Sequence, residues 1–567
     1  MKHLRFGNPE EFVPSRFCPQ MRAKESDVSY DLSRFQFKLT ARGCVLEFPL
    51  KEEEQIYGFG LQLKGFNHKN RKLQLRTNSD PVAYTGDSHA PVPFFASTAG
   101  YGMYFDTARY AEVHCGYGKN KNRKPEPDNR VIATAEDLYQ KCGLKETTVM
   151  SIGIPVAKGV DVYLFEGDSI LDIVSEYNRF SGGGPLVPAW GLGVMFRPYA
   201  RSTDRGIMEL ADYFRKKDIP CDCLGLEPGW QSSSYSCSYL WDEERFPEHE
   251  KMIAYLKERD FRINLWEHAF VNACSPLYGP LKPLSGDYEV WKGLIPDFSL
   301  PEARAIFAKH HREYLVEKGI DGFKLDECDN SDYVQDWSFP NCTAFPGGLD
   351  GEQYHQLFGS LYVQTILEAM GGRETYGQVR QMGALAASYP FVLASDLYDH
   401  KDFIRGVVNS GFSGLLWTPE LRDAASRKDL IRRLQTVVFS HLCLINSWYC
   451  QDLPWKEWEC EEEVRELLKL RKSLIPMLKA AFDAYHESGK PPIRALVMDY
   501  TDDPMTWSID DEYLFCDSLL VAPLTAESDT RQVYLPAGQW RDFWSKESLS
   551  AGWHTVTTEK IPVYEKI

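Results

Sequence analysis

The segment Gly319-Ile-Asp-Gly-Phe-Lys-Leu-Asp-Glu-Cys-Asp329 is the one around which the chain is organised, because it joins an expected helix to a short strand that ends in carboxylates. The charged, amphipathic segment 301–318 predicts the helix, and the run 322–325 predicts the strand. Successive side chains of a strand point to opposite faces, so Lys324 and Asp326 are expected to share one face. A helix that leads into a strand with an acid at its C-terminal end is typical of an α/β barrel.

The length and composition indicate a multidomain globular protein. A chain of 567 residues is too long for one hydrophobic core, and 43% hydrophobic residues can fill several. The net charge of −17 argues against nucleic acid and anionic membranes as partners. No apolar run is long enough to span a membrane, and the N-terminal segment lacks the apolar run of a signal peptide.

The cysteines predict the compartment and the absence of a metal site. The 14 Cys form no C-x-x-C pair and no zinc-like spacing with His. Several lie in strand-like apolar runs, which favours buried, reduced thiols over disulfides. We therefore expect a cytoplasmic protein without metal or other cofactor, and a homo-oligomer stays open.

Residues 1–184 predict an N-terminal β-sandwich. Short aromatic or alternating runs such as Phe35–Leu39 are separated by Gly, Asn, Asp and Pro at close spacing, and we expect this part to be all-β. The run Ser181–Pro185 marks the boundary. The segment Tyr84–Phe95 is rich in polar and aromatic residues, and we expect it, with Asp87, to reach away from the sandwich.

Between residues 185 and 485, short apolar runs alternate with helical stretches, which indicates parallel strands joined by crossover helices. Eight strands are expected, at Trp190–Arg197, Cys221–Glu227, Phe261–Glu267, Gly322–Asp326, Thr375–Arg380, Phe391–Asp396, Gly414–Glu420 and Leu442–Trp448. An open doubly wound sheet would need a Gly-rich phosphate turn, which the sequence lacks. Residues 486–567 become β-like again. The predicted fold class is α/β, a (β/α)8 TIM barrel with an N-terminal β-sandwich and a small C-terminal β domain.

Nearly every predicted barrel strand ends on a polar or charged residue. These residues are Arg197, Glu227, Glu267, Asp326, Arg380, Asp396 and Glu420. The C-terminal ends of barrel strands meet at one rim, where such enzymes place their active sites. Acids around Asp326 would otherwise be a solvated charge run on the surface. Five acids at the expected rim favour an active site instead.

The available residue types point to chemistry by carboxylates. Glycoside hydrolysis uses two of them, one ionised and one protonated. Asp326 has Lys324 two residues before it, and a neighbouring cation favours the ionised form. Asp396 follows the apolar run Phe391–Ala394, where burial would raise its pKa and keep it protonated.

Several motifs resemble glycoside hydrolase family 31 over nearly the whole chain. Tyr57-Gly-Phe-Gly-Leu-Gln62 is similar to the Y-G-L-G-E segment of that family's N-terminal sandwich, and Leu240-Trp-Asp-Glu-Glu-Arg-Phe-Pro247 to its W-D-x-x-R-F-P. Gly322-Phe-Lys-Leu-Asp326 looks like the nucleophile strand, in the Lys-x-Asp form of α-xylosidase-type members. Arg380 looks like the sugar-holding Arg, and Ala394-Ser-Asp396 stands where the family carries its acid/base Asp.

The resemblance implies a retaining exo-α-glycosidase that acts on an oligosaccharide or glycoside through a covalent intermediate. Asp326 would be its nucleophile and Asp396 its acid/base. The other residues expected to contact the substrate are Asp87, Glu227, Trp230, Glu267, Lys324, Arg380, Glu420 and Arg422. Glu327 and Asp329 are expected to be scaffolding rather than catalytic groups.

The chain departs from the α-glucosidase pattern at three places, two of which, the acid after the second strand and the His near the eighth, help to recognise glucose hydroxyls in that family. It has Leu226–Trp230 where α-glucosidases carry an Asp, Thr418–Asp423 where they have D-I-G-G-F, and Asn446–Trp448 where they have a His. Sites that bind particular hydroxyls reject other sugars, so an α-galactoside or a modified hexoside is expected. An α-glucosidase or α-xylosidase, a transglycosylase, and a non-catalytic carbohydrate-binding protein are the alternatives.

Overall fold

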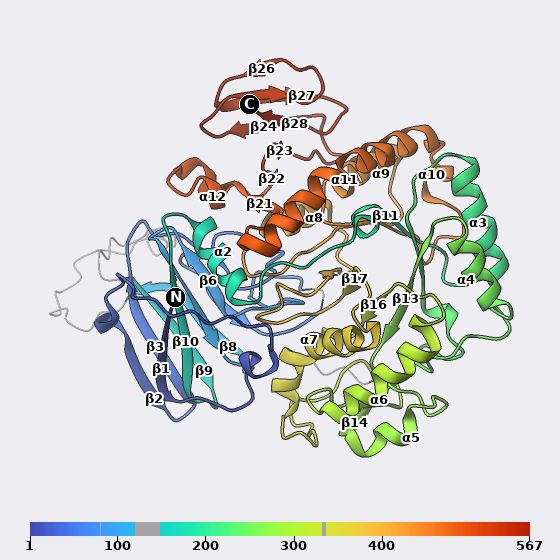
Figure 1. Cartoon of the computed structure of the whole chain (residues 1–567). Coiled ribbons are helices and arrows are strands. Elements are labelled where there is room, and N and C mark those ends of the chain that lie inside the picture. The colour runs from blue at the N-terminus through green and yellow to red at the C-terminus, as the bar shows by residue number, and fades with distance from the viewer. Residues whose placement is uncertain (80, 119–147, 331–335) are drawn as a thin grey trace, which may run out of the picture.

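The computed structural model describes residues 1–79, 81–118, 148–330 and 336–567, with a parallel β-barrel at its centre (Figure 1). The barrel strands are β11 (Val194–Arg197), β12 (Cys223–Leu226), β13 (Arg262–His268), β16 (Gly322–Asp326), β17 (Gly377–Val379), β18 (Phe391–Leu393), β19 (Glu420–Leu421) and β20 (Cys443–Asn446). They follow one another around the sheet in the order β18-β17-β16-β13-β12-β11-β20-β19. A parallel bridge between Leu393 and Trp417 joins the two ends, so the predicted TIM barrel is confirmed.

Helices in the outer layer cover this barrel. They are α3 (Asp204–Lys216), α4 (His249–Lys257), α5 (Tyr278–Leu281), α6 (Pro301–His311), α7 (Gly351–Met370), α8 (His400–Asn409), α9 (Arg427–Val438), α10 (Pro454–Glu457) and α11 (Glu461–Ser488). The helix predicted at 301–318 is confirmed as α6 with its continuation Arg312–Val316, and Gly319 then adopts a φ of 115°. Glycine permits this left-handed turn, which directs the chain into β16.

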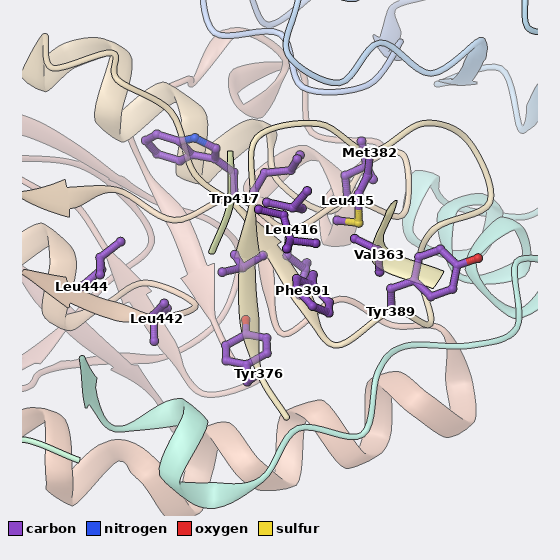
Figure 2. Packing of buried hydrophobic residues seen from close by; sticks show 14 of the residues in the cluster. Val363, Tyr376, Met382, Tyr389, Phe391, Leu415, Leu416, Trp417, Leu442 and Leu444 are labelled. Atoms are coloured by element: carbon purple, nitrogen blue, oxygen red, sulfur yellow. The ribbon is translucent and has the colours of Figure 1, made fainter. Parts of the chain in front are cut away.

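The strand nearest the closure of the barrel differs most from its prediction. Gly414–Glu420 was expected to be a strand, but only Glu420–Leu421 form β19. Gly414 has a φ of 73°, which breaks an extended run at its first residue. Figure 2 shows Leu415, Leu416 and Trp417 packed near Phe391 of β18, and all four side chains are buried in one core. The segment therefore closes the barrel mainly by packing.

The N-terminal domain is a sandwich of two antiparallel sheets. One has the order β1 (Lys2–Asn8), β10 (Lys158–Glu166), β7 (Tyr101–Asp106), β6 (Phe94–Ser97) and β4 (Ile56–Gly58). The other has β2 (Gln36–Thr40), β3 (Gly43–Leu50), β9 (Thr148–Pro155), β8 (Ala111–Gly118) and β5 (Lys72–Leu75). The all-β prediction was wrong at α2 (Ile170–Phe180), whose capping box between Ser169 and Asp172 is visible in the sequence.

The C-terminal part, red in Figure 1, is a small β domain reached through α11. Its main sheet has the order β21 (Ile493–Ala495), β22 (Tyr513–Phe515), β23 (Leu519–Val521), β28 (Val563–Lys566), β25 (Trp540–Asp542) and β26 (Ser548–Leu549). A second pair joins β24 (Thr530–Leu535) to β27 (Gly552–Thr557), and α12 (Leu496–Asp499) follows β21. The predicted domain boundaries at 184 and 485 stay predictions.

Two further features bear on the predicted environment. Among the described residues, no helix has both the length and the apolar character needed to cross a membrane. The 13 described cysteines are free, and ten of them are buried. The cytoplasmic location stays a prediction.

Candidate active site

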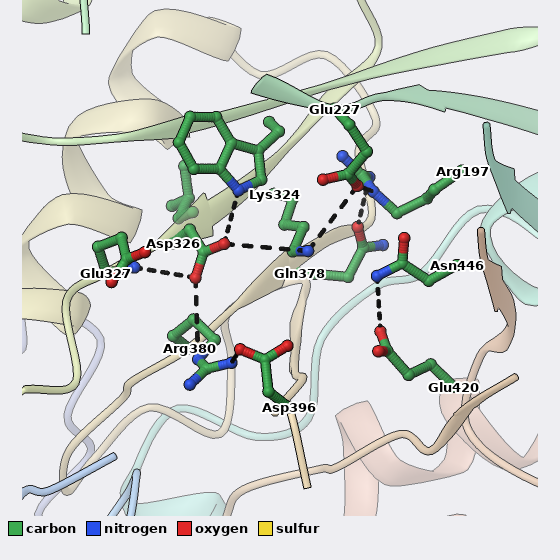
Figure 3. A network of polar contacts seen from close by, with 12 residues as sticks. Arg197, Glu227, Lys324, Asp326, Glu327, Gln378, Arg380, Asp396, Glu420 and Asn446 are labelled. Carbon is green, nitrogen blue, oxygen red and sulfur yellow. Dashed lines mark hydrogen bonds and ion pairs between the residues drawn. The ribbon is translucent and has the colours of Figure 1, made fainter. Parts of the chain in front are cut away.

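Asp326 ends β16 at the barrel mouth, where hydrogen bonds fix both of its carboxylate oxygens (Figure 3). Trp266 Nε1 donates to Oδ2 at 2.6 Å, and the Glu327 backbone N–H donates to Oδ1 at 2.9 Å. Lys324 Nζ lies 3.9 Å from Oδ2, and Arg380 Nε lies 3.8 Å from Oδ1. The predicted shared face of Lys324 and Asp326 is confirmed, and the carboxylate is held in one orientation.

Burial and charge act on Asp326 in opposite directions. Burial raises the pKa of Asp326, whereas Lys324 and then Arg380 favour the ionised form and lower it. The net shift of the Asp326 pKa is upward, so Lys324 opposes the effect of burial without cancelling it. The neighbouring Glu327 has a φ of 55°, and burial, followed by the charge of Asp326, raises its pKa well above the usual range.

Arg380 connects three carboxylates at the mouth. Its Nη1 donates to Asp396 Oδ2 at 2.5 Å, while Nε and Nη2 donate to Asp329 Oδ2 at 3.1 and 3.0 Å. His89 Nδ1, from the N-terminal domain, lies 2.6 Å from the same Asp329 oxygen. Asp329 therefore orients Arg380 between Asp326 and Asp396, and the N-terminal domain takes part in the site.

Asp396 lies three residues beyond β18, and its side chain is 53% exposed. The Arg380 guanidinium holds the pKa of Asp396 well below its usual range. Burial does raise this pKa, but the charge of Arg380, which follows β17, outweighs it, so the expectation of a net rise that keeps Asp396 protonated was wrong. The backbone carbonyl of Asp396 accepts a hydrogen bond of 2.6 Å from Arg422 Nη2, which fixes the turn that carries it.

A second polar group lies inside the barrel, at the level of Lys324 and below it. Glu227 is buried, forms an ion pair with Arg197 and lies 3.8 Å from Lys324 Nζ. Arg197 also donates to Asn264 Oδ1 at 2.7 Å and to Gln378 Oε1 at 3.2 Å. Glu227 thus borders the Asp326 site from below, and its negative charge is compensated by two cations.

A third polar group lies on β19 and β20. Asn446 Nδ2 donates to Glu420 Oε2 at 2.9 Å, and Arg422 Nε lies 3.0 Å from Glu420 Oε1. Burial raises the pKa of Glu420, and the charges of Arg422 and then Lys324 lower it. Asn446 Oδ1 and Ser447 Oγ are buried without a hydrogen-bond partner in the described structure. The group therefore contains a buried acceptor and a buried hydroxyl without a partner among the described residues.

Two predicted substrate contacts have buried side chains with partners inside the protein, and their role at the site stays a prediction. Glu267 is fully buried, with Oε2 3.0 Å from His311 Nε2 of α6 and Oε1 accepting from the Tyr362 hydroxyl of α7 at 2.7 Å. It points to the helix layer because its neighbours on β13 face inward. Trp230 is also fully buried, and its Nε1 donates to the Trp266 carbonyl at 2.7 Å.

Asp87 pairs with Arg76, and Asn78 Nδ2 lies 3.3 Å from its Oδ2. These contacts hold the N-terminal segment together. The role of Asp87 as a substrate contact stays a prediction. The residue of this segment that enters the site is His89, two positions later. The local sequence does not show whether Asp87 or His89 reaches Asp329, because this depends on how the N-terminal sandwich packs against the barrel.

Tyr235 was also missed by the sequence reasoning. Its ring centroid lies 5.5 Å from that of Trp266, whose indole binds Asp326. Burial, and after it the charges of Asp326 and Glu327, raise the pKa of Tyr235, so its hydroxyl lies within electrostatic reach of Asp326.

The described residues contain no group of three or more His, Cys, Asp or Glu that could hold a metal ion.

Comparisons with known proteins show the family of the chain. Residues 184–481 match the glycosyl hydrolases family 31 TIM-barrel domain, which is more than half of the chain. The C-terminal domain of the same family matches 489–566, and its N-terminal galactose mutarotase-like domain matches 22–113. The chain belongs to glycoside hydrolase family 31. It is therefore a member of a family of α-glycosidases, as the motifs predicted.

Named relatives differ in substrate. "Alpha-glucosidase 2" of Bacillus thermoamyloliquefaciens is 26% identical, over 93% of this chain and 68% of its own length. "Alpha-xylosidase" of Emericella nidulans is 23% identical, over 86% of this chain and 62% of its own. A family 31 dextranase of Flavobacterium johnsoniae complexed with glucose has the same fold, with a TM-score of 0.80 at 21% identity, over 95% of this chain and 68% of that chain.

Proposed function

We propose that the chain is a retaining exo-α-glycosidase that hydrolyses terminal α-linked sugars. The observation that carries the proposal is the pair Asp326 and Asp396, which are brought together at the barrel mouth by one guanidinium, that of Arg380. Two carboxyl groups about 5 Å apart serve a retaining mechanism, whereas a wider gap admits the water of an inverting one. A shared contact with Arg380 supports the close arrangement.

In the proposed reaction, Asp326 Oδ attacks the anomeric carbon while Asp396 gives its proton to the departing glycosidic oxygen. The carbon–oxygen bond to the leaving group breaks and an ester bond to Asp326 forms. A water molecule then gives a proton to Asp396, attacks the same carbon and releases Asp326 as a carboxylate. The two hydrogen bonds from Trp266 and Glu327 hold Asp326 ready for the first attack.

Asp396 must be protonated for the first step, and Arg380 opposes this in the free protein. We propose that a sugar hydroxyl takes up the Nη1 hydrogen bond of Arg380 when substrate binds. The pKa of Asp396 then rises, because its nearest cation now serves the sugar. The half-exposed position of Asp396 lets it exchange protons with solvent between the two steps.

For the substrate we propose an α-galactoside or a modified hexoside. The support comes from Glu227 and from the group Glu420, Arg422 and Asn446, which stand where α-glucosidases carry other residues. This group combines a carboxylate, a guanidinium and an amide, and its Arg422 donates to the Asp396 carbonyl. Such a donor and acceptor set discriminates among hydroxyl positions and substituents.

Covalent labelling tests the proposal. A fluorinated glycosyl fluoride that forms a slow glycosyl ester should label Asp326, as seen by mass spectrometry of the peptide that contains it. The sugar series should include gluco, galacto, xylo, N-acetylated and 6-modified forms. The matched control is Asp326→Asn, which should take no label. Labelling of another carboxylate would disprove the assignment, and transfer products outcompeting hydrolysis would make the chain a transglycosylase.

A further inference from the structure

The turn between β18 and α8 carries Asp396, and side chains rather than neighbouring strands hold its backbone. Among the described residues, no backbone N–H donates to the carbonyl of Asp396 or to that of Tyr398. Arg422 Nη2 donates to the first carbonyl at 2.6 Å, and Arg433 Nη1 donates to the second at 2.7 Å. Two guanidinium groups therefore satisfy carbonyls that a strand would otherwise satisfy by pairing.

The side chain of Tyr398 brings the two arginines together. The guanidinium carbon of Arg422 lies 4.5 Å from the centroid of the Tyr398 ring, and that of Arg433 lies 4.1 Å from it. A cation over the face of an aromatic ring is attracted by the negative charge of that face. The Tyr398 hydroxyl accepts from the Arg422 backbone N–H at 2.9 Å and donates to the Asp423 carbonyl. The turn that carries Asp396 is thus joined both to the chain after β19 and to α9.

Arg433 belongs to α9, a helix of the outer layer, and its own side chain is fixed there. Its Nε donates to Oδ1 of Asp429, one turn earlier on α9, at 2.9 Å. The Arg433 side chain is 11% exposed and that of Asp429 is 12% exposed, and salt screens such a shielded pair only weakly. The contacts of Arg433 in the described structure reach the backbone and the ring of Tyr398, not the Asp396 carboxylate. Arg433 therefore acts on the turn, from a rigid helix.

The Asp396 carboxylate depends on this turn for its position. Its side chain is 53% exposed, and Arg380 binds the carboxylate. In the proposed reaction, a sugar hydroxyl takes up that Arg380 hydrogen bond, which leaves the backbone of the turn to direct the carboxyl group. A general acid must lie about 2.6–3.2 Å from the atom that it protonates, and a small displacement lowers the rate strongly. What holds the turn therefore matters for the proton transfer.

We propose that Arg433 is a positioning residue for Asp396. Through Tyr398, it holds the turn so that the Asp396 carboxyl group meets the glycosidic oxygen of the leaving group. The proposal rests on the acid/base role of Asp396 in the function proposed above. It gives a helix of the outer layer a part in the reaction, and it predicts that the effect of Arg433 follows the proton demand of the leaving group.

Substrates that differ in their need for an acid separate positioning from stability. Arg433→Met removes the guanidinium group and fills most of its space. For the phenyl α-glycoside of the sugar that labels Asp326, kcat/KM should fall about 10–100-fold, because phenol leaves poorly without a proton. For the α-glycosyl fluoride of the same sugar, kcat/KM should stay within about twofold, because fluoride needs less help from the acid. Arg433→Lys keeps a cation that can donate to the carbonyl and should regain part of the loss.

The matched control is Arg432→Met, which changes the preceding residue of the same helix. Arg432 is 2% exposed and donates to the carbonyls of Thr558 and Glu559 in the C-terminal domain at 2.7 and 3.0 Å. Its replacement should lower the thermal midpoint but keep the wild-type ratio of kcat/KM for the phenyl glycoside to kcat/KM for the fluoride. Tyr398→Phe is a milder second variant, because it keeps the ring and removes the hydroxyl. It should lower this ratio by less than Arg433→Met does.

A double-mutant cycle with Asp396→Ala shows whether Arg433 acts through Asp396. In the Asp396→Ala background, Arg433→Met should cause no further loss on the phenyl glycoside, because the acid is already absent. Equal losses of Arg433→Met on both substrates, or a loss that persists undiminished in Asp396→Ala, would overturn the positioning role. The proposed function fails separately, if Asp396→Ala itself loses the same factor on the phenyl glycoside and on the fluoride.

Discussion

The ends of β16 and β18 hold their aspartates in different ways. Asp326, at the end of β16, receives hydrogen bonds on both oxygens and has two cations within 4 Å. Asp396, beyond β18, is half-exposed, and one guanidinium binds its carboxylate. A nucleophile gains from a fixed attack direction, whereas an acid/base must meet the leaving group and then a water molecule. Asp326 therefore suits the nucleophilic attack, and Asp396 suits the proton transfers.

Neutralising Asp326 should have the largest effect on activity. Asp326→Asn keeps the shape of the side chain but removes the nucleophile, so turnover should fall by about 10⁴-fold or more. Because burial raises the pKa of Asp326, the ionised carboxylate opposes folding at neutral pH, and the thermal midpoint of the variant should not fall. Steady-state kinetics measures the turnover, and calorimetry of the same sample measures the thermal midpoint. Wild-type turnover in Asp326→Asn would show that Asp326 is not the nucleophile.

The corresponding change at the end of β18 is Asp396→Ala. Its loss should depend on the leaving group, because the acid assists only departures that need a proton. Substrates with poor leaving groups should lose about 10²–10⁴-fold in kcat/KM, and activated aryl glycosides much less. A series of aryl α-glycosides of graded phenol pKa measures this slope. Equal losses across the series would contradict the acid role and would leave the two aspartates without distinct functions.

Much of the fold and part of this contrast were predictable from the sequence. The period of two along a strand placed Lys324 and Asp326 on one face, and the alternation of strands with helices gave the barrel. The same alternation along β13 places Trp266 on the inner face and Glu267 on the outer face of the barrel. The sequence could not show that β17 brings Arg380 against Asp396, nor that the sandwich brings His89 to Asp329, because both contacts arise from tertiary packing.

A smaller effect tests the electrostatic support of Asp326. Lys324→Met removes the cation that most favours the ionised carboxylate, so the raised pKa of Asp326 should rise further. Since Asp326 must be ionised to attack, the acidic limb of the kcat/KM profile should move to higher pH, by about one unit or more. Lys324→Arg keeps the charge and should keep the limb. A limb that stays in place or moves to lower pH in Lys324→Met would show that Lys324 does not control Asp326.

The smallest effect on catalysis is expected for Glu267. Its side chain lies on the outer face of the barrel, toward α6 and α7. Glu267→Met fills the space but leaves the His311 imidazole and the Tyr362 hydroxyl without their partner. Each buried group left unpaired costs about 1–3 kcal/mol of unfolding free energy. Denaturant unfolding should show this loss, while kcat/KM of the folded protein stays within about twofold because Glu267 faces the helix layer. A large rise in KM with unchanged stability would support Glu267 as a substrate contact and would contradict the outward direction of its side chain on β13.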